Sequence, residues 1–190
     1  IEINQFNGDT PDLFKAALTE IAKNPVKGII LDVRNNPGGT LDSAQAVAGY
    51  WIGKETLLKE RRQAKIVEVV KGTTEARLAT VPTVVLVNGG SASASEIVAG
   101  ALQDYGKATL IGTKTFGKGS VQDFQILPDG GAVKITVAEW LTPKDRVVHE
   151  RGIEPDIMID RTEADYVAER DPQLERARDF LRGKASQRVL

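Results

Sequence analysis

The chain has 190 residues, with 25 Lys and Arg against 26 Asp and Glu, which gives a net charge of −1. Apolar residues make up 41% and charged residues 27% of the composition, which indicates a globular chain rather than a disordered or membrane-spanning one. The sequence has no Cys and one His, which excludes disulfides, thiol nucleophiles, thiolate metal sites and sites built from several imidazoles. The balanced charge also argues against a dedicated nucleic-acid surface.

Apolar spacing predicts one domain over 1–190 in which strands and helices alternate. In chain order, we expect a half-buried strand over 1–6, a helix over 12–21, a strand buried on both faces over 28–33, and a helix over 41–51. A polar insertion over 53–80, with one strand at 65–70, is followed by a strand over 83–87, a helix over 93–105 and a strand over 108–112. A hairpin of 122–127 and 132–141, a strand over 157–159 and a helical tail over 161–190, with its helix at 172–181, complete the chain. The pattern predicts an α/β fold.

Three glycine-rich turns come directly after predicted buried strands. They are Asn36-Pro37-Gly38-Gly39, Asn88-Gly89-Gly90-Ser91 and Thr115-Phe116-Gly117-Lys118-Gly119. Because the turns that follow parallel strands meet at one edge of a sheet, we expect them to lie together and to form the binding site.

The middle turn carries Ser91, Ser93 and Ser95 into a helix, where outward-pointing N–H groups favour an oxyanion. Taken alone, this stretch indicates only a helix start, because Ser93-x-x-Glu96 is also a capping box. The spacing by itself therefore leaves the nucleophile open among the three hydroxyls.

A serine nucleophile needs a base, and Lys118 lies between glycines in the next turn. A lysine accepts a proton only when it is neutral, so we expect Lys118 to be desolvated, with the Gln122 amide four positions on holding the amine without restoring its charge. The alternative for Lys118 is a solvated loop lysine. His149, oriented by Asp32 or Asp145, is a rival base, although its polar surroundings favour a surface histidine.

The sequence resembles the carboxyl-terminal processing (tail-specific) serine peptidases. The resemblance rests on residues 31–39, 90–97, 117–119, 152–157 and 171–174, in that order and spacing. It implies a ClpP/crotonase-like core of repeated ββα units and a reaction that needs no metal or cofactor. It assigns Ser93 as nucleophile, Lys118 as base and Gln122 as the residue that orients the lysine. Backbone N–H groups of Ala94 and of Gly38 or Gly39 would form the oxyanion hole, with Glu96 in support.

The same resemblance implies polypeptide substrates bound by their carboxyl-terminal region and an extracytoplasmic location in a bacterium, and the balanced charge predicts no nucleic-acid partner. Members of the family carry a PDZ domain, and the chain begins at Ile1 without one, so we expect it to be the catalytic core of a longer protein with that domain as a regulatory partner in cis. Oligomerisation is left open. The rival functions are a non-catalytic ligand- or peptide-binding module of the same fold and a crotonase-like acyl-CoA enzyme.

Overall fold

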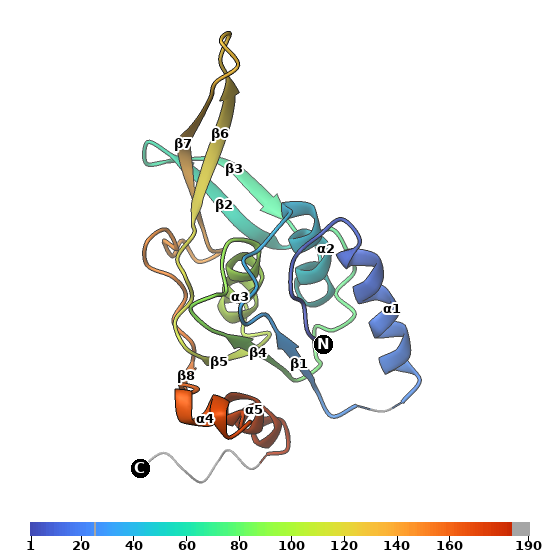
Figure 1. The fold of residues 1–190 in the computed structure, drawn as a ribbon. Helices are drawn as coiled ribbons and strands as arrows, with labels where there is room; N and C mark the ends of the chain where they lie inside the picture. Colours follow the sequence, from blue (N-terminus) through green and yellow to red (C-terminus); the bar gives the residue numbers. More distant parts are fainter. Residues whose placement is uncertain (25, 184–190) are drawn as a thin grey trace.

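The computed structural model describes residues 1–24 and 26–183, which form helices and two sheets (Figure 1). The helices are α1 (Thr10–Ala22), α2 (Leu41–Ile52), α3 (Ala94–Asp104), α4 (Glu163–Val167) and α5 (Pro172–Leu181). The strands are β1 (Ile29–Asp32), β2 (Thr56–Arg62), β3 (Lys65–Lys71), β4 (Thr83–Val87), β5 (Thr109–Gly112), β6 (Ser120–Ile126), β7 (Ala132–Leu141) and β8 (Ile157–Met158). This arrangement confirms the predicted α/β class.

A parallel sheet in the order β1-β4-β5-β8 forms the centre of the fold. All five residues of β4 are buried, because the two faces of the sheet are covered by different helices. Val85 and Val87 pack into the main core with residues of α2 and α3, whereas Val84 and Leu86 pack against Ala177 of α5. The continuous apolar run over 83–87 thus correctly predicted a strand that is buried on both faces of the sheet.

The tail helix α5 has the bounds that the sequence predicted, 172–181. It begins with Pro172 after the N-cap Asp171, whose side chain accepts a hydrogen bond from the Leu174 N–H at 2.9 Å. Figure 1 shows α4 and α5 below the parallel sheet, on the opposite side from α3. Residues 184–190 of the predicted tail lie outside the described residues.

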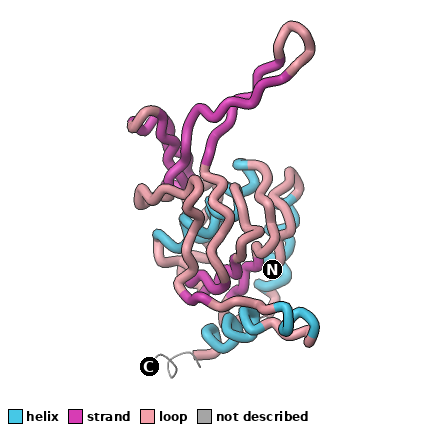
Figure 2. The backbone as a smooth tube through the Cα atoms, turned by 60° about the vertical axis from the view of Figure 1, so that its left-hand side comes forward, coloured by secondary structure: helices cyan, strands magenta, loops and turns pink. Residues whose placement is uncertain are grey.

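The second sheet is antiparallel, in the order β3-β2-β7-β6. The β6–β7 hairpin confirms the turn predicted at Pro128–Gly131, and it extends away from the body of the molecule (Figure 2). The stretch 53–80 contributes β2 and the predicted β3 to this sheet. The sequence did not predict β2, because its charged residues Lys59–Arg62 interrupt the apolar alternation of a strand.

The strand predicted over 1–6 is wrong. The segment forms only isolated bridges, from Glu2 to Asp32 and from Phe6 to Gly39. It runs parallel to the end of β1 and then along the turn that follows, so its partner is not one regular strand. Ile3 and Phe6 are nevertheless buried, as the alternation of apolar and polar residues indicated.

Candidate active site

The predicted gathering of the glycine-rich turns is confirmed, because each follows one of the adjacent strands β1, β4 and β5. Asn35 and Asn88 join the first two turns: the Asn35 N–H donates to Asn88 Oδ1, and Asn88 Nδ2 donates to Asn35 Oδ1, both at 2.8 Å. The Phe116 N–H donates to the Ser91 carbonyl at 3.0 Å and ties the third turn to the second. The three turns therefore form one connected surface at the carboxyl edge of the sheet.

The three hydroxyls of the middle turn have different environments. Ser91 Oγ donates to the Val33 carbonyl at 2.7 Å, and Ser95 Oγ donates to the Asn36 carbonyl at 3.0 Å, both in fully buried positions. Ser93 is only partly buried. Two of the hydroxyls thus hold the first turn against the second, which leaves Ser93 as the one suited to meet a substrate.

Ser93 precedes the first residue of α3 and has φ 53° and ψ −115°. A positive φ is unusual for a residue with a side chain, and such strain persists only where the surrounding structure enforces it. Here the enforcing group is Glu96, whose carboxylate accepts the Ser93 N–H at 2.9 Å, while the Glu96 N–H donates to the Ser93 carbonyl at 2.9 Å.

Glu96 is completely buried and also holds the lysine turn. Its Oε1 accepts the Thr115 hydroxyl at 2.6 Å and the Gly117 N–H at 2.7 Å, and its Oε2 accepts the Lys118 N–H at 2.9 Å. Oε2 is also the oxygen that accepts the Ser93 N–H, so the backbone nitrogens of Ser93 and Lys118 share one acceptor atom. The helix-start pattern in the sequence gave no sign of this second role.

Glycines are required on both sides of Lys118. A Cβ at Gly117 would lie 2.9 Å from the Gly152 nitrogen, and a Cβ at Gly119 would lie 2.4 Å from the His149 nitrogen. The backbone of the turn therefore packs directly against the segment 148–152. The Lys118 side chain is exposed to solvent, so the desolvation that the sequence led us to expect is not present in this structure.

Gln122 is also exposed, on β6, opposite Thr136 of β7. Within residues 1–24 and 26–183, no hydrogen bond joins Ser93 Oγ, Lys118 Nζ and the Gln122 amide to one another. The structure thus brings the backbones of Ser93 and Lys118 together without connecting their side chains.

The two glycines of the first turn have different hydrogen-bonding roles. A Cβ at Gly38 would lie 2.7 Å from Ser93 Cβ and 2.9 Å from the Ala94 nitrogen, so Gly38 lies directly against the serine turn. Its own N–H donates to Asn36 Oδ1 at 2.9 Å. In the part of the chain that the structure describes, neither the Gly39 N–H nor the Ala94 N–H has an intramolecular acceptor.

The rival base His149 has neither of its expected partners. Asp32 forms an ion pair with Arg34 at 2.6 Å, and Asp145 forms one with Lys59 at 2.8 Å. The Nδ1 atom of His149 is buried without a hydrogen-bond partner among the described residues. A serine–histidine–aspartate triad is therefore not formed.

Two further observations concern cofactors and membranes. Over 1–24 and 26–183, no group of three or more His, Cys, Asp and Glu side chains is placed to hold a metal ion. In the same residues, no helix combines the length and the apolar character needed to cross a bilayer.

A serine on a strained turn between a parallel strand and a helix, facing a Gly-Gly turn, is the arrangement found in serine hydrolases. Comparison with known proteins identifies the group within that class. Residues 1–159 match the model of peptidase family S41, and the chain belongs to this family.

The individual relatives agree with this assignment. The chain is 43% identical over 162 residues to a probable CtpA-like serine protease of Staphylococcus aureus, which covers 84% of this chain and 33% of that protein. A protein of the same name from Staphylococcus saprophyticus is 41% identical over 160 residues, which covers 83% of this chain and 33% of that protein. The chain thus spans about a third of the length of these curated relatives.

Solved structures show the same fold. The photosystem II D1 C-terminal processing protease superposes with a TM-score of 0.79 at 36% identity, over 84% of this chain and 41% of that one. Mature CPAF superposes over all of this chain and 52% of its own, with a TM-score of 0.75 at 15% identity, which is a likeness of fold alone.

Proposed function

We propose that this chain is the catalytic core of a serine endopeptidase that cleaves polypeptides near their carboxyl termini through an acyl-enzyme. The observation that carries the proposal is the Glu96 carboxylate, which ties the backbones of Ser93 and Lys118 to one oxygen. The membership of family S41 and the likeness to a C-terminal processing protease support the reaction and the polypeptide substrate.

In the proposed reaction, Ser93 Oγ attacks the carbonyl carbon of the scissile peptide while Lys118 Nζ accepts the hydroxyl proton. Collapse of the tetrahedral intermediate breaks the carbon–nitrogen bond, and the leaving amine takes the proton from Lys118. Water then hydrolyses the acyl-enzyme, with Lys118 again accepting a proton, and Ser93 is regenerated.

We assign the oxyanion hole to the N–H groups of Ala94 and Gly39 rather than Gly38. The Gly38 N–H is already engaged by Asn36 Oδ1. The Gly38 carbonyl accepts the Phe6 N–H at 2.8 Å, so a trans peptide directs the Gly39 N–H the opposite way. A hole needs donors that are in place before the reaction, and these two N–H groups lack other acceptors among the described residues.

The exposed lysine gives the bound peptide a second role in this scheme. Lys118 and Gln122 are both exposed, and in the proposed complex a substrate that covers the three turns excludes water from the Lys118 amine. Removal of water favours the neutral amine, and the Gln122 amide can orient it without adding charge. We therefore propose that Ser93 and Lys118 reach hydrogen-bond distance in the substrate complex.

For the full-length protein, we propose a PDZ domain acting in cis and an extracytoplasmic location. The support for both is the family resemblance of the motifs. Expression of the full-length protein in its host, followed by fractionation and immunoblotting, tests the location. Recovery of the protein in the cytoplasmic fraction would contradict it.

The activity is tested with Ser93→Ala, Lys118→Ala and the control Lys144→Ala, an exposed lysine outside the site. Peptides with a free carboxyl terminus are incubated with each variant, and the products are identified by mass spectrometry. Loss of cleavage in the first two variants, with unchanged far-UV circular dichroism, is expected. Full turnover by Ser93→Ala would refute the mechanism, and calorimetric binding of acyl-CoA without peptide cleavage would favour the acyl-CoA alternative.

A further inference from the structure

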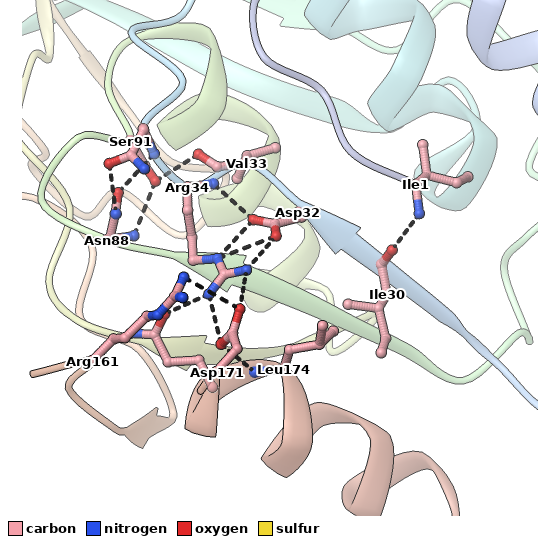
Figure 3. A network of polar contacts seen from close by, with 12 residues as sticks. Ile1, Ile30, Asp32, Val33, Arg34, Asn88, Ser91, Arg161, Asp171 and Leu174 are labelled. Atoms are coloured by element: carbon pink, nitrogen blue, oxygen red, sulfur yellow. Dashed lines mark hydrogen bonds and ion pairs between the residues drawn. The ribbon is translucent and has the colours of Figure 1, made fainter. Parts of the chain in front are cut away.

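The guanidinium of Arg34 is the centre of a polar cluster on the side of the sheet covered by α5 (Figure 3). Its Nη2 contacts Asp32 at 2.6 Å and Asp171 at 2.9 Å, and its Nη1 donates to Asp171 Oδ1 and Gln173 Oε1, both at 2.9 Å. Asp32 ends β1, whereas Asp171 and Gln173 begin α5, more than a hundred residues later. We call Arg34, Asp32, Asp171 and Gln173 the Arg34 clamp.

The clamp is well satisfied and largely shielded from water. The Arg34 side chain is 13% exposed, and the side chains of Asp32 and Asp171 are each 20% exposed. Burial acts against the charge of Arg34, but its hydrogen bonds to Asp32 and Asp171 outweigh this effect and raise its pKa. Gln173 is 3% exposed and is itself fixed, because its Nε2 donates to the Ile159 carbonyl at 2.8 Å. A planar guanidinium suits such paired contacts, which a lysine cannot reproduce.

In the sequence, Arg34 directly precedes the first of the three glycine-rich turns. Arg34 is followed by Asn35, whose φ of 56° starts the turn, and then by the buried Asn36. Asn36 holds Gly38 through its Oδ1, and its carbonyl accepts the Ala92 N–H at 3.0 Å. The turn is therefore anchored by the serine turn at one end and by Arg34 at the other.

We infer that the start of α5 is a positioning element for the active site. Asp171 and Gln173 hold Arg34, and Arg34 in turn fixes the Asn35–Gly39 turn, which presents the N–H group of the proposed oxyanion hole. Residues 171–174 are among the motifs that carry the family resemblance, whereas the family model itself matches residues 1–159. The inference rests on the proposed function for its catalytic consequence, whereas the positioning of the turn can be measured without it.

The central test is Asp171→Asn. Asparagine caps a helix as well as aspartate does, so the bond to the Leu174 N–H can remain while the charge facing Arg34 is removed. Asp165→Asn is the control, because Asp165 lies in the first turn of the tail helix α4, where it accepts the N–H of the N-cap Thr162, and it pairs with Arg170 at 2.9 Å without contacting Arg34. Arg34→Lys is the second test variant, since it keeps the charge and removes the bridging geometry.

Two readouts separate positioning from mere stability. The first is hydrogen exchange at the N–H groups of Asn36 and Gly38, which should become several-fold faster in Asp171→Asn and Arg34→Lys and stay unchanged in Asp165→Asn. The second is the rate at which a fluorophosphonate labels Ser93, together with peptide turnover. We expect the labelling rate and kcat to fall roughly 10-fold, with KM changed by less than about twofold.

Exchange that is unchanged in the turn would overturn the inference, and so would faster exchange combined with normal labelling and kcat. If the wild-type chain neither cleaves peptides nor reacts with the phosphonate, the proposed function fails. The positioning of the turn by α5 would then be judged by the exchange measurement alone.

Discussion

Replacing Glu96 with glutamine tests the core of the site with a change of almost no volume. In the wild type, both carboxylate oxygens act only as acceptors, from the N–H groups of Ser93, Gly117 and Lys118 and from the Thr115 hydroxyl. A glutamine amide turns one of these oxygens into an NH2 donor. Whichever way the amide is oriented, it faces at least one N–H that it cannot accept.

The hydrogen-bond partners at position 96 determine which orientation of the glutamine amide costs less free energy. With its NH2 toward Thr115 and Gly117, the amide can still donate to the Thr115 hydroxyl, which can act as an acceptor, but the buried Gly117 N–H loses its partner. An unsatisfied buried donor costs about 1–3 kcal/mol. The bonds to Ser93 and Lys118 also change from charge-assisted to neutral, which makes them roughly half as strong. We expect Glu96→Gln to lower the free energy of unfolding by about 2–4 kcal/mol.

Urea unfolding measures this change, and fluorophosphonate labelling measures the reactivity of Ser93. Labelling should slow, because the strained backbone of Ser93 loses part of the support that enforces it. Glu154→Gln is the control, since Glu154 is an exposed residue paired with Lys114, and its unfolding free energy should stay within about 0.5 kcal/mol of wild type. If Glu96→Gln matches Glu154→Gln in both stability and labelling, the carboxylate does not organise the site.

Gly38→Ala should abolish labelling of Ser93, because its Cβ would lie 2.7 Å from Ser93 Cβ. The control Gly130→Ala has a similar φ of +85° but nothing within 4 Å, and its urea unfolding should show a loss of only about 1–2 kcal/mol; equal effects would contradict the predicted clash. Burial opposes ionisation of Asp171, but its hydrogen bonds with Arg34 and the Leu174 N–H, together with the charges of Arg34 and Arg161, outweigh this and lower its pKa. Its ion pair therefore stabilises the fold above about pH 4 and is lost as the pH falls through the lowered pKa. The unfolding free energies of wild type and Asp171→Asn should converge as the pH falls below the lowered pKa of Asp171, and a constant difference would contradict this.

The sequence predicted those elements whose burial follows a simple period. The run 83–87 is apolar throughout because the sheet is covered on both faces, and 172–181 shows one apolar stripe because one face of α5 is covered. The predictions failed for two segments whose pairing partners, rather than a regular apolar period, determine their structure. β2 is stabilised by its pairing with β3 and β7 rather than by an apolar stripe, and the segment 1–6 changes partner part of the way along its length.

For the site, the sequence predicted the turns but not what holds them. Parallel strands bring consecutive turns to one edge, and that rule is enough to group Gly38, Ser93 and Lys118. The contacts of Glu96 with the turn 22 residues ahead, and of Arg34 with Asp171, 137 residues away, have no local period to reveal them. The sequence did offer an exposed Lys118, as the alternative to a desolvated one, and the structure shows that side chain exposed.

The division of the fold into two sheets indicates which part of the site is adjustable. Ser93 and the Gly38–Gly39 turn both follow strands of the parallel sheet, whereas Lys118 lies in the connection from β5 to the antiparallel strand β6. Glu96 fixes that connection at the Lys118 N–H, so the lysine backbone moves with the serine turn rather than with the β6–β7 hairpin. The lysine side chain has no such anchor among the described residues. Under the proposed function, a bound peptide therefore has to order one exposed side chain, whereas the turns are already assembled without it.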